Sequence, residues 1–234
     1  MRRDSRLARL FDRNMFIMLL AVMLGAIIIT FFLADIIRQS EFDVERKSYI
    51  QEIEDVTTEK NIFENQSRNF TDNFFKSLSS LDLSREYRAE ANSYFDFAAS
   101  IWFPQKDYIK TIENCTSAME SYIFAYDNFL NTASFFNTTK NYSSEIKYSS
   151  IIDLYIGLSK SGASISMIRY NASKYLRSIA ENLSLYGEGT NVSELLVLFN
   201  ETNDLYDQEI GGYNDLVDEI ENEFFKYFNP NRET

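Results

Sequence analysis

Nine asparagines in this sequence stand in Asn-x-Ser/Thr triplets, none with proline in the middle position. The triplet is the acceptor pattern for N-linked glycosylation, in which a sugar is attached to the side-chain amide of a chain outside the cytosol. Chance would give about three triplets in a chain of this composition. We therefore expect several to carry glycans, although the abundance of Asn, Ser and Thr is an alternative, purely compositional explanation. The nine are Asn65, Asn69, Asn114, Asn137, Asn141, Asn171, Asn182, Asn191 and Asn200.

Two shorter patterns match fragments of enzyme motifs. Ser144-Glu-Ile-Lys147 has the Ser-x-x-Lys spacing and in this respect resembles penicillin-recognising enzymes. The companion Ser-Asp-Asn and Lys-Thr-Gly elements are missing, so a chance match at a helix start is the better interpretation. The segment GEGTN at 187–191 resembles the start of a phosphate-binding loop, but it follows an expected helix and lacks a Gly-Lys-Ser/Thr ending. We interpret it as a turn between helices.

Composition excludes several kinds of chemistry. The sequence contains no histidine, which removes the usual general base at neutral pH and the commonest metal ligand. Cys115 is the only cysteine, so neither an internal disulfide nor a thiolate metal cluster can form. The net charge of −12 argues against a nucleic-acid partner. We therefore predict that the chain is not an enzyme, uses no cofactor, and has neither catalytic nor metal-binding residues.

Carboxylates are frequent toward the C-terminus, where their spacing of three or four residues would suit Ca²⁺ or Mg²⁺. A calcium loop needs a turning backbone with a glycine at the bend, so a solvated helix face is the better interpretation. Arg169, Lys174 and Arg177 form a modest basic group with two explanations, an anion site or ion pairs with these acids. Stripes of Tyr and Phe are interpreted as filled core rather than as a ligand cavity. The acidic residues are Glu201, Asp204, Asp207, Glu209, Asp215, Asp218, Glu219, Glu221 and Glu223.

The elements that position these residues begin with an apolar stretch. Residues 15–34 carry no charge, and a helix of that length spans about 30 Å, the thickness of the hydrocarbon core. A cleaved signal peptide would be shorter and would end in a small-x-small site, whereas Ala34 follows Phe32 here. We predict an uncleaved signal-anchor, a transmembrane helix over residues 15–37. The leader, residues 1–14, has a net charge of +3, which leaves −15 for the remainder. The positive-inside rule then places the leader in the cytoplasm and residues after 37 outside the cell.

The remaining pattern is helical. Apolar residues recur at alternating steps of three and four from the anchor to Leu81, the spacing of a coiled coil, with no Gly or Pro between residues 35 and 81. A short helix is predicted over 84–102, capped by Ser84 and ended by Phe103-Pro104. Long helices are predicted over 106–136, over 144–186, and from a cap at Ser193 or Asn191 to Phe228, with a loop at 137–144 and a disordered tail at 229–234. The small residues of 159–166 should let another helix approach closely. The first stripe consists of Phe42, Tyr49, Ile53, Val56, Phe63, Phe70, Phe74 and Leu81, interrupted by Arg46, Lys60, Ser67 and Ser77.

The predicted fold class is all-α. An N-terminal single transmembrane helix continues into an extracytoplasmic antiparallel helical bundle, residues 38–228, of four long helices plus one short helix. At the level of architecture alone, this arrangement is similar to the four-helix input domains of bacterial and archaeal chemoreceptors. It departs from them because only 14 residues are expected in the cytoplasm and no second membrane segment follows. A sensing role would therefore require a partner protein to carry the signal.

The leading functional prediction is a structural or protein-interaction role in a surface or membrane complex. The expected partners are the lipid bilayer, N-linked glycans, and either another protein or a second copy bound through helical faces. One alternative is a ligand-sensing ectodomain that works through a partner. A less favoured one is a pilin-like filament subunit packed through residues 15–37, because the leader lacks the usual small residue before the apolar stretch. Acidity, scarce cysteine and many triplets together are typical of an archaeal cell envelope.

Overall fold

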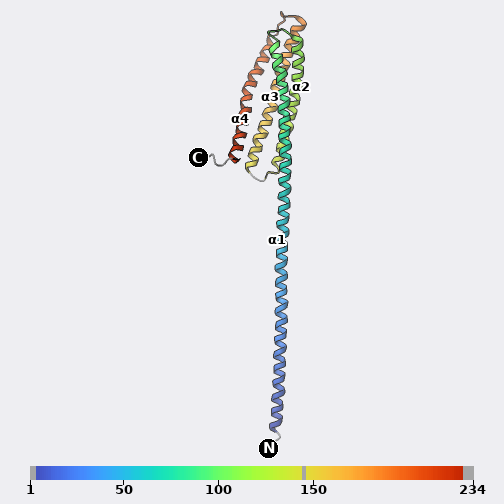
Figure 1. Ribbon diagram of the computed structural model, residues 1–234, viewed down its shortest axis with the longest axis vertical. Coiled ribbons are helices and arrows are strands. Elements are labelled where there is room, and N and C mark those ends of the chain that lie inside the picture. Colours follow the sequence, from blue (N-terminus) through green and yellow to red (C-terminus); the bar gives the residue numbers. More distant parts are fainter. Residues whose placement is uncertain (1–3, 144–145, 229–234) are drawn as a thin grey trace. The chain divides into compact units, whose positions relative to one another are not determined.

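A computed structural model describes residues 4–143 and 146–228, with side chains at residue 15 and over 18–143 and 148–224. Four helices account for 93% of this described chain, which contains no strand, so the all-α prediction is confirmed. The predicted tail at 229–234 and Ser144 of the Ser-x-x-Lys pattern lie outside the described residues. The helices are α1 (Asp4–Ile101), α2 (Tyr108–Lys140), α3 (Ile146–Tyr186) and α4 (Ser193–Phe228) (Figure 1).

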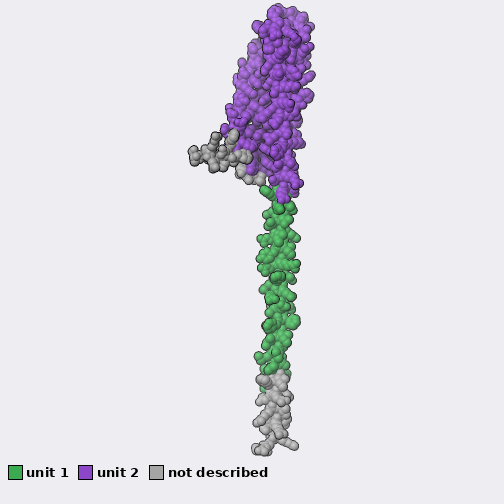
Figure 2. Space-filling model, in the orientation of Figure 1, with its two compact units in different colours: residues 1–63 green, residues 64–234 purple. Residues whose placement is uncertain are grey.

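The chain divides into two compact units, Met1–Phe63 and Glu64–Thr234 (Figure 2). Over residues 4–63 the first unit is a single helical segment of α1. Every residue from 18 to 63 is exposed except Gly25, which is half-buried. This segment includes a stretch near the N-terminus that is long and apolar enough to cross a membrane, and none of that stretch is buried by the protein itself.

In the second unit the C-terminal part of α1 packs with α2, α3 and α4, and neighbouring helices run antiparallel (Figure 1). The direction follows from contacts in which residue numbers rise along one helix and fall along the next. On α1, Ser77 lies against Thr139 of α2, whereas Ser84 lies against Thr132. The same opposite order relates α2 to α3, α3 to α4 and α4 back to α1. The contacts are Lys140–Asp153 and Phe129–Gly162, then Gly157–Leu216 and Arg169–Asn203, then Arg85–Tyr213 and Phe95–Phe199.

A seven-residue repeat of small side chains brings α1 and α2 together. On α1 the repeat is Ser77, Ser84, Ala91 and Ala98, all fully buried. On α2 it is Thr111, Ala118, Ala125, Thr132 and Thr139, also fully buried. Because these side chains are short, the helices approach closely enough for the hydroxyls of Ser80 and Thr132 to lie 2.7 Å apart. Larger side chains fill the space beside this line of contact, including Tyr122, Phe129 and Phe136, each with no exposed surface.

The buried hydroxyls of the bundle are satisfied within the protein. The hydroxyl of Ser166 donates to the carbonyl of Gly162 on the same helix, and that of Ser173 donates to the carbonyl of Arg169. Such bonds to the carbonyl four residues earlier leave no unpaired group, so a serine or threonine can replace an apolar residue in the core at little cost. The other buried hydroxyls with this bond are those of Ser77, Ser84, Thr111, Thr132, Thr139 and Ser159.

Two predicted boundaries were wrong, both because tertiary packing outweighs local propensity. The short separate helix over 84–102 does not exist, since α1 continues without a break to Ile101. Ser84, predicted to cap it, instead packs against Thr132 inside the helix. The predicted loop at 137–144 begins later, because α2 continues to Lys140. Thr139 there is fully buried, and its hydroxyl bonds to the carbonyl of Phe135.

The chain reverses direction where the sequence predicts it. Helix α1 ends at Ile101, two residues before Phe103-Pro104. Asp107 then caps α2, because its side chain accepts a hydrogen bond from the backbone amide of Lys110 at 3.2 Å. After α3, Gly187 adopts a φ of +83°, a conformation that favours glycine. The two turns are joined by an ion pair between Lys106 and Glu188, 2.6 Å apart.

The predicted close approach at residues 159–166 is confirmed at Gly162. A Cβ added there would lie 2.6 Å from a ring carbon of the fully buried Phe129. Elsewhere on α3, a Cβ at Gly157 would meet only Leu216, at an ordinary 3.8 Å.

We therefore expect Gly162→Ala and Gly157→Ala to have opposite effects. Alanine at 162 should lower the free energy of unfolding by about 1–3 kcal/mol, because the Phe129 ring has no space into which to move. Alanine at 157 should raise it by about 0.5–1 kcal/mol, because glycine is the poorer helix former. Denaturant unfolding of the full chain in detergent measures both, and equal effects would contradict the packing described at Gly162.

Candidate functional site

The nine triplet asparagines fall into two groups by exposure. Six are exposed, and Asn65 and Asn69 among them lie on α1. The other three are half-buried, and the side-chain nitrogens of Asn114 and Asn182 already donate to carbonyls of their own helices, each at 2.8 Å. Since the sugar would be attached to that nitrogen, the exposed group is the better set of acceptors. The exposed set is Asn65, Asn69, Asn137, Asn141, Asn191 and Asn200, and the third half-buried one is Asn171.

The acidic residues of α4 form an exposed helix face. Each is exposed except Glu223, which is half-buried. Within the part of the chain that the structure describes, no three His, Cys, Asp or Glu side chains lie close enough together to hold a metal ion. The opposite side of α4 is apolar and packs on α1 and α3 through Tyr213 and Ile220, both buried. The arrangement is that of an amphipathic helix on the surface of a bundle.

The predicted basic group separates in space. Arg177 pairs with Glu181 on its own helix at 2.8 Å, and Lys174 is exposed. Arg169 is half-buried and points into the bundle, where its Nη1 donates to the amide oxygen of Asn203 at 2.9 Å. These two arginines therefore contact an α4 amide and an α3 carboxylate, so ion pairs with the acidic face of α4, one of the two explanations left open by the sequence, do not describe the contacts they make.

Two arginines that face the bundle interior are held by aromatic rings, which the sequence did not reveal. The guanidinium of Arg169 lies 3.6 Å from the ring centre of Tyr206 and 4.7 Å from that of Phe95. Arg88 lies 4.2 Å from the ring centre of Tyr213 and 5.4 Å from that of Phe129. One guanidinium nitrogen of each arginine is buried without a hydrogen-bond partner, so the ring faces supply the compensating attraction. These contacts attach α4 to α1 and α3.

The segment GEGTN is an interhelical turn, as the sequence indicates. Thr190 donates its backbone amide to the carbonyl of Gly187 at 3.1 Å, and Asn191 accepts from the amide of Ser193 at 3.1 Å. Glu188 is committed to Lys106. The amides of Thr190 and Ser193 and the carboxylate of Glu188 are therefore engaged within the protein.

The part of α1 that follows the apolar stretch also exposes apolar side chains. Between residues 38 and 63, eleven of 26 residues are charged, so this segment does not belong in a bilayer core. It nevertheless exposes large apolar side chains along one side, with exposed fractions of 46% to 68%. Fully burying each would stabilise an assembly by about 1.5–3 kcal/mol. We call this set the α1 apolar face: Phe42, Tyr49, Ile50, Ile53, Val56 and Phe63.

The remaining sides of this segment are mainly polar, although Val44 and Ile62 are also exposed there. Gln51 and Asp55 bond to each other at 3.0 Å, and the hydroxyl of Thr58 bonds to the carbonyl of Glu54. Five members of the α1 apolar face belong to the stripe predicted from spacing. Ile50 was missed because it does not fit strict steps of three and four, although it directly widens the stripe beside Tyr49. A face that is apolar on one side and polar on the other is typical of a helix that packs against another helix.

The single cysteine is buried and chemically inert. Cys115 has no exposed surface, and burial raises the pKa of its thiol to about 12, while the nearby Arg177 lowers it by a smaller amount. Only the thiolate is a nucleophile. Between pH 9 and 12 the thiol of the unfolded chain ionises and that of the folded chain does not, so the stabilisation from this group is lost as pH rises through that window.

We therefore expect alkylation of Cys115 at pH 8 to be slower in the folded protein by about a thousandfold or more, as three pKa units require. The measurement is the rate of iodoacetamide labelling of folded and guanidinium-unfolded chain, read by mass spectrometry. Labelling of the folded protein at the rate of a free peptide thiol would contradict the burial of this side chain.

The described residues thus offer a candidate membrane span, an exposed apolar face beside it on α1, and a bundle with a buried apolar core. Comparison with family models, with curated proteins and with solved structures finds no match for this chain.

Proposed function

We propose that the chain is a single-pass membrane protein whose residues 38–228 form an extracytoplasmic helical bundle with a structural or protein-interaction role. The α1 apolar face carries this proposal. Large apolar side chains exposed in one line, on a segment too charged for the bilayer core, are typical of a surface that binds another protein.

Anchoring is supported by the exposed apolar stretch of α1. Residues 15–37 include side chains such as Phe31 and Phe32, which are 74% and 69% exposed. In water that exposure is unfavourable, whereas in hydrocarbon it is the favourable state, and a helix satisfies its own backbone hydrogen bonds there. The net charge of +3 before the stretch favours a cytoplasmic N-terminus. All nine triplets follow the stretch, which agrees with the same orientation.

Cysteine labelling tests the orientation. We expect a membrane-impermeant maleimide added to intact cells to label Thr58→Cys, an exposed position, and to leave Ser5→Cys unlabelled until the cells are permeabilised. Cys115 remains in both variants because its buried thiol does not react. Labelling of Ser5→Cys alone would reverse the orientation. Recovery of the wild-type chain in the soluble fraction, without detergent, would remove the anchor altogether.

Glycosylation follows from the proposed orientation. We expect glycans on the exposed triplets, with Asn65 and Asn69 among them, and none on Asn114 and Asn182, whose amide nitrogens are engaged. Mass spectrometry of glycopeptides from the protein in its natural host measures the occupancy of each site. The double variant Asn65→Gln/Asn69→Gln should lower the mass by two glycans, and Asn114→Gln serves as the control that changes nothing. Occupancy of Asn114 and Asn182 at the level of the exposed set would contradict the expectation.

A further inference from the structure

The α1 apolar face continues a seven-residue repeat that is already an interface farther along the same helix. If the repeat is written abcdefg, the d positions begin with Phe42, Tyr49, Val56, Phe63 and Phe70 and continue with Ser77, Ser84, Ala91 and Ala98. The second group is small and buried against α2. From 42 to 63 the d residues are large, apolar and 58% to 68% exposed. A helix surrounded by water does not need large apolar side chains at these d positions. The exposed part of the repeat therefore indicates a second interface, and its large side chains would hold a partner helix farther away than α2 lies from α1.

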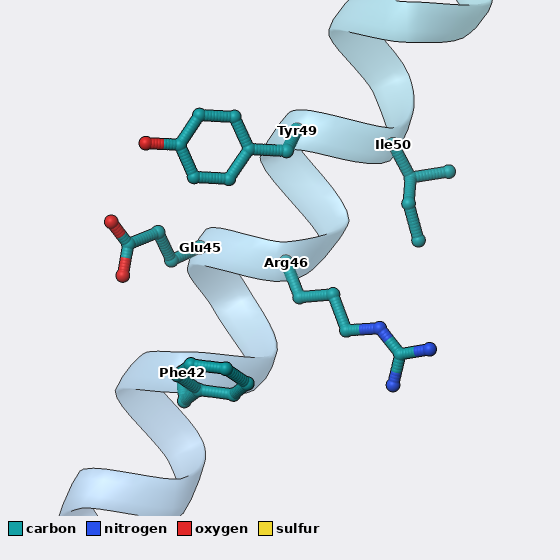
Figure 3. A pocket seen from close by; sticks show the side chains of 5 residues that line it. All are labelled: Phe42, Glu45, Arg46, Tyr49 and Ile50. Carbon is teal, nitrogen blue, oxygen red and sulfur yellow. The ribbon is translucent and has the colours of Figure 1, made fainter.

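The surface of this segment has the form that coiled-coil packing requires. Phe42, Glu45, Arg46 and Tyr49 border a hollow on α1, with Ile50 beside it (Figure 3). In the repeat these four residues occupy successive d, g, a and d positions. Four such residues form the hole that receives the a side chain of a parallel partner helix. Figure 3 shows Glu45 and Tyr49 projecting to one side of the hollow and Arg46 and Ile50 to the other.

We propose that the occupant is a second copy of this chain, and that residues 38–63 form a parallel, in-register, two-stranded coiled coil. The parallel direction rests on the proposed function, because two copies anchored in one bilayer leave it in the same direction. The a positions are Gln39, Arg46, Ile53 and Lys60, and the d positions supply two aromatic layers, a valine layer and a third aromatic layer. The coil buries the α1 apolar face on both copies.

Charge complementarity favours a second copy in this direction. Arg38 at g faces Asp43 at e of the second copy, an attractive pair at the start of the coil. Arg46 at a lies beside Glu45 at g of the second copy, and Lys60 is placed in the same way beside Glu59. The cations that interrupt the apolar stripe therefore meet carboxylates across the interface.

The antiparallel arrangement is disfavoured by the same charges. It would set the g positions of the two copies against one another, and three of the four, Glu45, Glu52 and Glu59, are carboxylates, whereas only Arg38 is a cation. The parallel coil contains one like-charge pair between g and e positions, Glu59 with Glu64 of the second copy, and Lys60 lies next to it. It also sets Arg46 and Lys60 against the same residues of the second copy, where Glu45 and Glu59 at the flanking g positions offset the repulsion. The triplet asparagines Asn65 and Asn69 occupy f and c, positions outside the contact, so glycans and the coil are compatible.

Disulfide formation in membranes tests the proposal. Single cysteines are introduced from residue 52 to 58 in the full-length chain, membranes are oxidised briefly, and disulfide-linked dimer is measured on non-reducing gels. We expect Val56→Cys at d to cross-link at least about tenfold faster than Thr58→Cys at f, because f side chains lie on opposite outer sides of the coil, beyond the reach of a disulfide. Ile53→Cys at a should give the second maximum. Both Val56 and Thr58 are exposed and neither packs on the bundle, so neither substitution threatens folding.

A disrupting variant completes the test. Ile53→Asp, added to Val56→Cys, places two carboxylates in one layer beside Glu52 of each copy, without the opposite charge that Arg46 and Lys60 meet, and should lower the cross-linking rate by about tenfold or more. In detergent, light scattering should give two copies of the 27.4 kDa chain for the wild type and one for Ile53→Asp. A flat cysteine scan, maxima away from 53 and 56, a mass of three copies, or an unchanged rate in the Ile53→Asp variant would each overturn the coil. Thr58→Cys also separates the two proposals: failure of the coil leaves its labelling from outside intact, whereas failure of the proposed topology abolishes that labelling.

Discussion

The close contact of small side chains between α1 and α2 is the constraint on which the bundle depends. Ser77, Ser84, Ala91 and Ala98 repeat every seven residues on α1 and are fully buried. Side chains this short bring two helix backbones together, and the large residues beside them, such as Phe129 and Phe136, then have defined spaces to fill. Gly162 allows a similarly close contact between α2 and α3, because the ring of Phe129 occupies the space where a Cβ atom would lie. Larger residues along this repeat would separate the helices and open the core.

Most buried hydroxyl groups in this bundle form hydrogen bonds within their own helix. Serine and threonine hydroxyls at the helix contacts bond to carbonyls of their own helices, and the hydroxyl contacts between α1 and α2, such as Ser80 with Thr132, add only short links to them. The two arginines inside are different, since Arg88 and Arg169 rely on ring faces contributed by other helices. A guanidinium is weakly hydrated for a cation and stacks on rings, which a lysine ammonium does less well. The packing of α4 on the bundle therefore includes specific arginine–ring contacts, whereas the packing of α2 on α1 depends on the small size of the side chains between them.

Sequence reasoning found the helices because periodicity is a strong signal over long segments, and it erred where tertiary contacts decide. The scarcity of Gly and Pro and the long stripes predicted the all-α class and the ends of α3 and α4. Serine is a common helix N-cap, and only the contact of Ser84 with Thr132 explains why Ser84 lies within a helix. Thr139 has the type of a loop residue, and its burial explains why α2 continues past it. The stacking of Arg169 on Tyr206 joins residues from two helices, a relation that no local pattern encodes.

The same repeat explains why the α1 apolar face is informative about function. A helix that continues an interface repeat without an internal partner keeps its large residues only if something covers them, since exposed aromatics on a charged segment bring a risk of non-specific association. Along α1 the d position changes from bulky to small between Phe70 and Ser77, within the second unit. Large d residues and basic a residues suit a contact in which the two helices lie farther apart and carboxylates flank the interface. Small d residues suit the close contact between α1 and α2. The proposed coil would therefore use the same seven-residue register of α1 as its contact with α2, with large d residues in place of small ones.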